Sequence, residues 1–223
     1  MQRYNVFLMV HKGLRAMLYD TSLSLQHTDF AHASERPQSL EKLALVLDIF
    51  DAHAGHEDKY VFSLLESCAA DLMNEMEAEH VTDHALSAGI RKLIADFTTA
   101  ATPAEKYNIG YSICRMYNDF IAFNLTHLNK EETVVNEALW SNYTDLDIIQ
   151  ANQRLISSLS PEEVKRNAIW MIRSCSNGEI IGWINAIKKD IPAPVLGLLM
   201  QLIEQELPIH RLEAVQNGIM EVA

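Results

Sequence analysis

Nine histidines are spread along the 223 residues of the chain, and three of them have a second metal-capable side chain four positions later. The three pairs are His53 with Glu57, His80 with His84, and His127 with Glu131. On a helix, residues four apart project from one face at roughly 6 Å, so that one turn can present two ligands to one site. Imidazole and carboxylate groups bind transition-metal ions, and a carboxylate can bridge two cations. The spacing therefore predicts a metal centre.

Long helices must position these pairs. Gly and Pro are scarce, with 8 and 6 residues, and apolar residues recur every three or four positions rather than in alternation. This pattern predicts an all-α chain with long helices over about residues 4–26, 37–70, 72–98 and 103–140. His11 lies on the first of these helices, and each of the next three carries one pair.

Long helices joined by short connections pack as antiparallel neighbours, which predicts an up-down-up-down four-helix bundle. We expect residues 1–141 to form this metal-binding bundle and residues 142–223 to add C-terminal helices packed on it. In that second part Ser160, followed by Pro161, predicts a helix start. The dipeptide at residues 177–178 predicts a helix end, and the prolines at 192 and 194 predict a break between the last helices.

The number of candidate ligands fits a pair of metal ions. Two octahedral ions offer about 12 coordination positions. Five imidazoles fill five of these, two bridging glutamates fill four, and a shared oxo or hydroxo group fills two. One position is left for a small diatomic ligand such as dioxygen or nitric oxide.

The order of these residues resembles the hemerythrin-like, or HHE cation-binding, family over roughly residues 4–140. After His11 the motifs read HAGHE at 53–57, HVTDH at 80–84 and HLNKEE at 127–132. The resemblance implies a four-helix bundle of hemerythrin type that holds two iron ions, bridged by an oxo or hydroxo group. Zinc and manganese are the other metals that we consider for this set.

The last carboxylate ligand has two candidates. Oxygen carriers of the family place it five residues after the histidine, which selects Glu132, whereas the HHE branch uses four, which selects Glu131. We expect Glu131, because it repeats the spacing of His53 and Glu57. Glu77, Glu79 and Asp83 are expected on a solvated face, with the alternative that one of them orients an imidazole.

Three functions stay open. The first is a binding protein that takes up dioxygen or a related diatomic molecule for sensing, storage or delivery. The second is a di-iron enzyme, such as an oxidase, a peroxidase, or a protein of nitric-oxide processing or iron-centre repair. It ranks second because the sequence supplies neither a substrate pocket nor a reductase motif. The third is a structural cation site in an interaction protein.

Charge and composition exclude several partners. The net charge of −12 disfavours nucleic acid and anionic membranes, and no run of 18 apolar residues predicts a membrane span. The three cysteines form no CxxC pair, so we expect a reducing cytoplasm and small buried thiols. A C-terminal apolar face fits either packing within the monomer or a homodimer surface, and its residues are Ile181, Trp183, Ile184 and Ile187.

Overall fold

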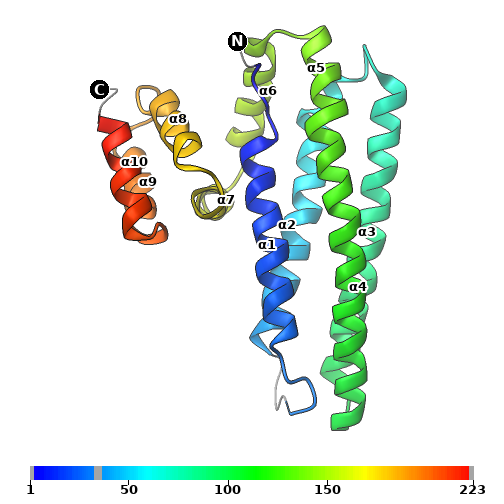
Figure 1. Cartoon of the computed structure of the whole chain (residues 1–223). Coiled ribbons are helices and arrows are strands. Elements are labelled where there is room, and N and C mark those ends of the chain that lie inside the picture. The colour runs from blue at the N-terminus through cyan, green and yellow to red at the C-terminus, as the bar shows by residue number, and fades with distance from the viewer. Residues whose placement is uncertain (1–2, 33–36, 221–223) are drawn as a thin grey trace. The chain divides into compact units, whose positions relative to one another are not determined.

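The computed structural model describes residues 3–32 and 37–220, and all regular structure within these ranges is helical (Figure 1). Its elements are α1 (Leu8–Gln26), α2 (Gln38–Tyr60), a 3-10 turn η1 (Phe62–Leu64), α3 (Ala70–Thr99), α4 (Pro103–Lys130), a π-helical turn η2 (Glu131–Val135), α5 (Asn136–Asn142), α6 (Asp145–Ser158), α7 (Pro161–Ser174), α8 (Asn177–Ile187), α9 (Ala193–Glu206) and α10 (Ile209–Met220). The prediction of an all-α chain is confirmed.

By their contacts the described residues fall into two units. The first takes its residues from Met1–Val6 and Met17–Ser157, and the second from Phe7–Ala16 and Ser158–Ala223. Helix α6 therefore groups with the first unit. The domain boundary expected after residue 141 stays a prediction.

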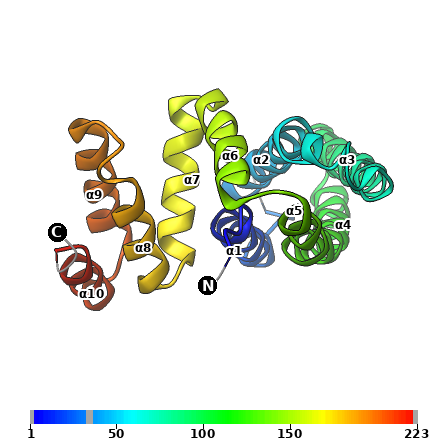
Figure 2. The ribbon, with the colours of Figure 1, turned by 90° about the horizontal axis from the view of Figure 1, so that it is seen from above.

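In the first unit the long helices α2, α3 and α4 lie side by side (Figures 1 and 2). Their side-chain pairs show that neighbours run antiparallel, because residue numbers rise on one helix as they fall on the next. Between α2 and α3 the pairs are Asp58 with His80 and Asp48 with Arg91. Between α3 and α4 they are Glu75 with Lys130 and Asp83 with Asn124.

Aromatic and aliphatic side chains fill the space between these helices. Phe50 of α2 packs edge-on against Phe120 of α4, with ring centroids 5.4 Å apart. Tyr117 is buried next to Phe120, and its hydroxyl donates a hydrogen bond of 3.3 Å to the carbonyl of Leu18 on α1. This apolar core ties α1, α2 and α4 together, so polar groups buried beside it sit in a medium of low polarity.

The fourth long helix is interrupted by the π-helical turn η2. The backbone N–H of Asn136 bonds to the carbonyl of Glu131, five residues earlier, so one turn holds an additional residue. Single π turns inside α-helices occur frequently at functional sites. The sequence predicts one helix over residues 103–140; the structure keeps the chain helical through Asn142 but adds this turn, which the apolar spacing does not reveal.

Capping residues set several helix starts. Thr102 before α4, Ser160 before α7 and Ser176 before α8 each form a capping box with the glutamate three residues on. The start predicted at Ser160 is therefore confirmed. The helix end predicted at residues 177–178 is wrong, because the Ser176 cap makes these residues the first turn of α8.

The second unit has its own apolar core, formed by α7 to α10. Ile172, Ile180, Ile184 and Ile203 are completely buried in it. Three more apolar residues of α8 pack against this core, namely Ile181, Trp183 and Ile187. Packing within the unit thus accounts for the apolar face of α8, and the homodimer stays a prediction. None of the described helices combines the length and the apolar character that crossing a membrane requires.

Close packing at Gly110 gives the first prediction. A β-carbon at this position of α4 would overlap the ring of Phe30. Gly110→Ala should therefore lower the free energy of unfolding by about 1–3 kcal/mol, measured by urea denaturation of the metal-free protein. Gly55→Ala on α2 is the matched control, since a β-carbon there meets nothing within 4 Å, and it should raise stability by up to about 1 kcal/mol. Equal effects of the two substitutions would contradict the packing.

The cysteines give the second prediction. The expectation that all three are buried is wrong for Cys68, which is exposed, whereas Cys175 is buried. Burial raises the pKa of the Cys175 thiol to about 11, and the nearby Glu179 adds to the rise. In the folded protein at pH 8, Ellman's reagent should modify Cys68 at once and Cys175 only after unfolding, because the thiolate is the reactive form. Mass mapping of the modified cysteines measures the two rates. Equal rates at Cys68 and Cys175 would contradict the burial of Cys175.

Candidate metal site

Helix α2 supplies the first two site residues. Glu57 faces the core with 2% of its side chain exposed, and its Oε1 lies 3.1 Å from Nε2 of His53, one turn earlier. His53 is at the edge of the core, with 16% of its side chain exposed. The predicted i, i+4 pair on α2 thus points to one place, as the spacing requires.

Helices α3 and α4 bring three more residues to Glu57. Glu57, His80, His127 and Glu131 are all buried, and each offers one ligand atom such that the four atoms lie within 4.8 Å of one another. His80 Nε2 is 3.8 Å from Glu57 Oε2 and 4.0 Å from Glu131 Oε1, while His127 Nε2 is 3.3 Å from Glu131 Oε1. A cation placed among these atoms would be within reach of two imidazoles and two carboxylates.

The two carboxylates also belong to a second group. Atoms of His53, Glu57 and Glu131 lie within 4.8 Å of one another. The two oxygens of Glu57 face different histidines, since Oε1 approaches His53 and Oε2 approaches His80. Glu57 is therefore placed as a bridging carboxylate would be, with one oxygen for each of two cations.

Carboxylates behind the two core histidines fix the direction of each ring. Nδ1 of His80 is 2.7 Å from Asp58 Oδ1, and Nδ1 of His127 is 2.7 Å from Glu79 Oε2. Because a carboxylate accepts, each Nδ1 carries the proton and each Nε2 presents its lone pair to the centre of the group. Nε2 of His80 lies beyond hydrogen-bond distance of the glutamate oxygens around it, which leaves a buried acceptor for a cation.

The electrostatics of the group favour positive charge. Burial lowers the pKa of His127, but the hydrogen bond and charge of Glu131, with Glu79 and Glu57 behind, outweigh burial and raise that pKa to about 9. Burial likewise opposes protonation of His80, yet its hydrogen bond to Asp58 and the charge of Glu57 raise its pKa. The protein thus stabilises positive charge at this place, and a proton is its simplest form.

Aromatic rings cover both histidines. Phe62 of η1 stacks on His80 at 5.3 Å between centroids, and Phe123 stacks on His127 at 6.1 Å. Water has little access between these rings, because His80, His127 and Glu131 are all buried. The polar group therefore sits in an apolar shell.

The two glutamates after His127 are placed differently. Glu131 is completely buried and belongs to both groups, whereas Glu132 is partly exposed and belongs to neither. The structure thus puts at the group the glutamate four residues after the histidine. The π turn begins at Glu131, so the backbone departs from α-helical geometry at this residue.

Two predicted ligands, His84 and His11, remain to be placed. The side chain of His84 on α3 is 46% exposed, its Nδ1 lies 2.9 Å from Asp51 Oδ1, and it belongs to neither group described here. His11 is completely buried near the start of α1, in the segment Phe7–Ala16 that groups with the second unit. The ring of Phe7, in the same segment, lies 5.1 Å from the ring of His11.

Sequence reasoning missed the carboxylates that orient the histidines. Asp51 and Asp58 on α2 were not singled out, although Asp58 directly follows Glu57. The solvated face expected for Glu79 and Asp83 is wrong for Asp83, which is buried and accepts a hydrogen bond of 2.5 Å from Asn124. Glu79 matches the alternative, that one acid on this face orients an imidazole.

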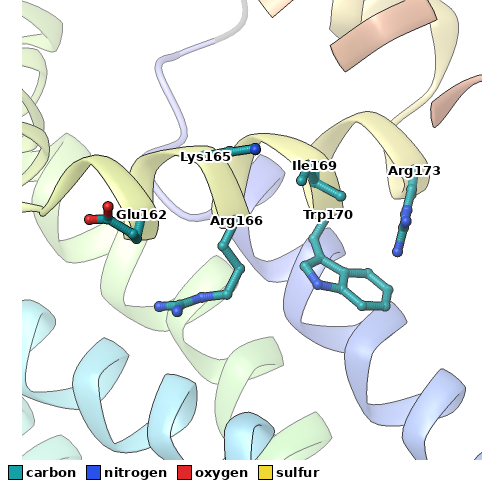
Figure 3. A pocket seen from close by; sticks show the side chains of 6 residues that line it. All are labelled: Glu162, Lys165, Arg166, Ile169, Trp170 and Arg173. Atoms are coloured by element: carbon teal, nitrogen blue, oxygen red, sulfur yellow. The ribbon is translucent and has the colours of Figure 1, made fainter. Parts of the chain in front are cut away.

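A pocket elsewhere offers different chemistry. It has a volume of about 320 Å³ and is lined by α7, and Figure 3 shows Arg166 and Trp170 projecting from the same side of that helix. The guanidinium of Arg173 lies over the Trp170 ring at 5.0 Å. The lining residues include no histidine or cysteine, so this pocket does not compete as a metal site.

Comparison with known proteins agrees with the geometry. Residues 3–139 match the family described as the Hemerythrin HHE cation binding domain. That range includes every residue of the two groups. No curated protein and no solved structure gives a significant match to the chain.

Glu79 yields the third prediction. Lys130 of α4 donates hydrogen bonds to Glu75 and Glu79, which both lie on α3. Of these two acids only Glu79 also accepts a hydrogen bond from His127. Glu79→Gln should weaken binding of ferrous iron by about 10–100-fold, because the ring loses the acceptor that fixes its Nδ1 proton. Glu75→Gln removes the same charge from the same lysine and should leave affinity nearly unchanged. Competition with a chromogenic chelator measures both, and a similar loss in the two variants would show that only net charge matters.

Proposed function

Because the family match covers more than half of its length, the chain belongs to the hemerythrin HHE cation-binding family, and we propose that it is a non-haem di-iron protein that binds dioxygen or a related diatomic molecule. The role we infer is sensing, storage or delivery of that molecule. The observation that carries the proposal is the sharing of two buried glutamates by two groups of potential ligands.

In this proposal His80 and His127 would hold one iron, His53 would hold the other, and Glu57 and Glu131 would serve both. The contacts of Glu57 support the bridging role, since its two oxygens approach the histidines of different groups. Glu131 supports it because it is buried and belongs to both groups of potential ligands. We propose His11, a completely buried histidine within the matched residues, as a further ligand.

The charge of the site supports a divalent or trivalent ion. Two carboxylates in an apolar shell are costly unless positive charge compensates them, and a single proton on an imidazole does so only in part. A pair of iron ions would compensate them fully. The donor atoms are all nitrogen and oxygen, a set that iron, zinc and manganese accept, and we propose iron as the resident metal.

When bound, the iron pair would supply redox-active metal with an open coordination position for a diatomic ligand. The chain's own residues do the rest. Asp58 and Glu79 hold the imidazole rings in position, and Phe62 and Phe123 keep water from the group. Exclusion of water favours binding of a small neutral molecule over binding of a hydrated ion.

The helices that carry these residues fit the architecture we propose, an up-down-up-down bundle of hemerythrin type formed by α1 to α4. Antiparallel pairing of α2 with α3 and of α3 with α4 supports it. The pairs Asp20 with Lys42 and Ser39 with Thr28 support the same arrangement for α1 and α2. We further propose that α7 to α10 pack on this bundle as an additional helical part.

Metal content tests the proposal. Protein produced with iron should contain about two irons per chain, as a bridged two-metal site requires, and its absorption should change on reduction and again on exposure to air. His80→Ala should lose iron while its circular dichroism stays helical, and His27→Ala, at an exposed histidine of the same unit, should keep both ions. Iron-free protein with an unchanged spectrum, or full iron content in His80→Ala, would rule out the di-iron site.

A further inference from the structure

The two rings that cover the metal group are held by different kinds of backbone. Phe123, stacked on His127, lies inside the long helix α4. Phe62, stacked on His80, lies in η1, a 3-10 turn of three residues in the connection from α2 to α3. Such turns have poorer hydrogen-bond geometry than α-helices, and connections open locally more readily than the long helices beside them. Of the two covers, Phe62 is therefore the one that can move without unwinding a long helix.

The turn η1 lies between His80 and solvent. Phe62 is completely buried on the imidazole, whereas Ser63, the next residue of the turn, is exposed. Asp58, which accepts the hydrogen bond from Nδ1 of His80, has 37% of its side chain exposed, while His80 itself has 4%. Displacement of η1 would therefore open this side of the group to solvent.

A tyrosine far along the chain holds η1 in place. The hydroxyl of Tyr143, at the C-terminal cap of α5, donates a hydrogen bond of 2.6 Å to the carbonyl of Leu64, the last residue of η1. The end of α5 and the connection from α2 to α3 lie at the same end of the first unit (Figure 1). Sγ of Cys68, a weak donor, is 3.5 Å from the same carbonyl. The Tyr143 hydroxyl is thus the strong donor at the end of the turn.

The backbone of Tyr143 is itself fixed by Arg3. The guanidinium donates to the carbonyl of Tyr143 at 2.7 Å and to that of Trp140 at 2.9 Å, and its Nε lies 2.5 Å from a carboxylate oxygen of Asp145. These residues, like η1 and His80, all belong to the first unit. Tyr143 therefore joins a fixed helix end to a turn that is otherwise held by its own short hydrogen bonds and by packing.

From these contacts we propose that η1 is a lid over the metal group, that metal ions and small ligands enter and leave on the His80 side when it opens, and that Tyr143 is the positioning residue that keeps it closed. The gating role rests on the proposed di-iron function. Loss of one hydroxyl–carbonyl bond should shift the opening equilibrium by roughly 2–10-fold. Because the lid opens in metal-free and metal-loaded protein alike, easier opening speeds uptake and release equally and leaves affinity unchanged.

The first arm of the test is hydrogen exchange in the metal-free protein, resolved at the amides of Leu64 and Leu65, which are bonded within the connection. In Tyr143→Phe these amides should exchange roughly 2–10-fold faster than in the wild type. Tyr117→Phe is the matched control, because it removes a tyrosine hydroxyl bond to a different backbone carbonyl of the same unit, that of Leu18. In this control the two amides should exchange at the wild-type rate.

The second arm follows ferrous iron anaerobically in the same three proteins. Stopped-flow mixing measures the rate of uptake by metal-free protein and the rate of release to a chromogenic chelator, and competition measures affinity. Tyr143→Phe should raise both rates by the same factor, roughly 2–10-fold, with no change in affinity, and Tyr117→Phe should change neither rate. A tyrosine that only stabilised the site would instead speed release alone and so lower affinity.

The contrary results separate the lid from the function on which its role rests. Unchanged exchange at Leu64 and Leu65 in Tyr143→Phe, release that speeds without uptake, or equal effects in Tyr117→Phe would overturn the lid and leave the di-iron function standing. A wild-type chain that takes up no iron would overturn the proposed function and the gating role together.

Discussion

Burial of two glutamate side chains among histidines is the constraint on which the rest of the structure depends. Glu131 is inaccessible to solvent and Glu57 is 2% exposed, inside a core that also holds stacked phenylalanines. Removing a carboxylate from water costs several kcal/mol, and partial pairing with one protonated imidazole recovers only part of that. The arrangement is stable as a whole when cations occupy the space that the nitrogen and oxygen atoms surround.

The helices serve this constraint in distinct ways. The buried face of α3 includes His80, whereas His84, one turn later, is 46% exposed and contacts Asp51. The π turn begins at Glu131, so the fourth helix changes its backbone geometry at a residue of the site. Carboxylates behind His80 and His127 set the protonated nitrogen of each ring, so each Nε2 is available at the centre. Each feature is local, and together they converge on one group.

Much of the fold and of the site could be predicted from the sequence, because helical spacing is readable directly. The pairs His53 with Glu57 and His127 with Glu131 meet as their i, i+4 separation requires. The separation of His80 and His84 is the same, yet the structure places one inside and one outside. Only the longer pattern of buried positions on α3, which includes the polar Asp83, distinguishes them. The acids at 51, 58 and 79 act through contacts between helices, which no spacing within one helix predicts.

X-ray absorption spectroscopy at the iron edge tests the central claim most directly, because it reports the atoms around the metal in the protein as it exists. The account predicts a first shell of nitrogen and oxygen only, and an iron neighbour at roughly 3.5–4 Å. A spectrum with no iron neighbour, or with sulfur in the first shell, would contradict the two-metal site that Glu57 and Glu131 are proposed to bridge.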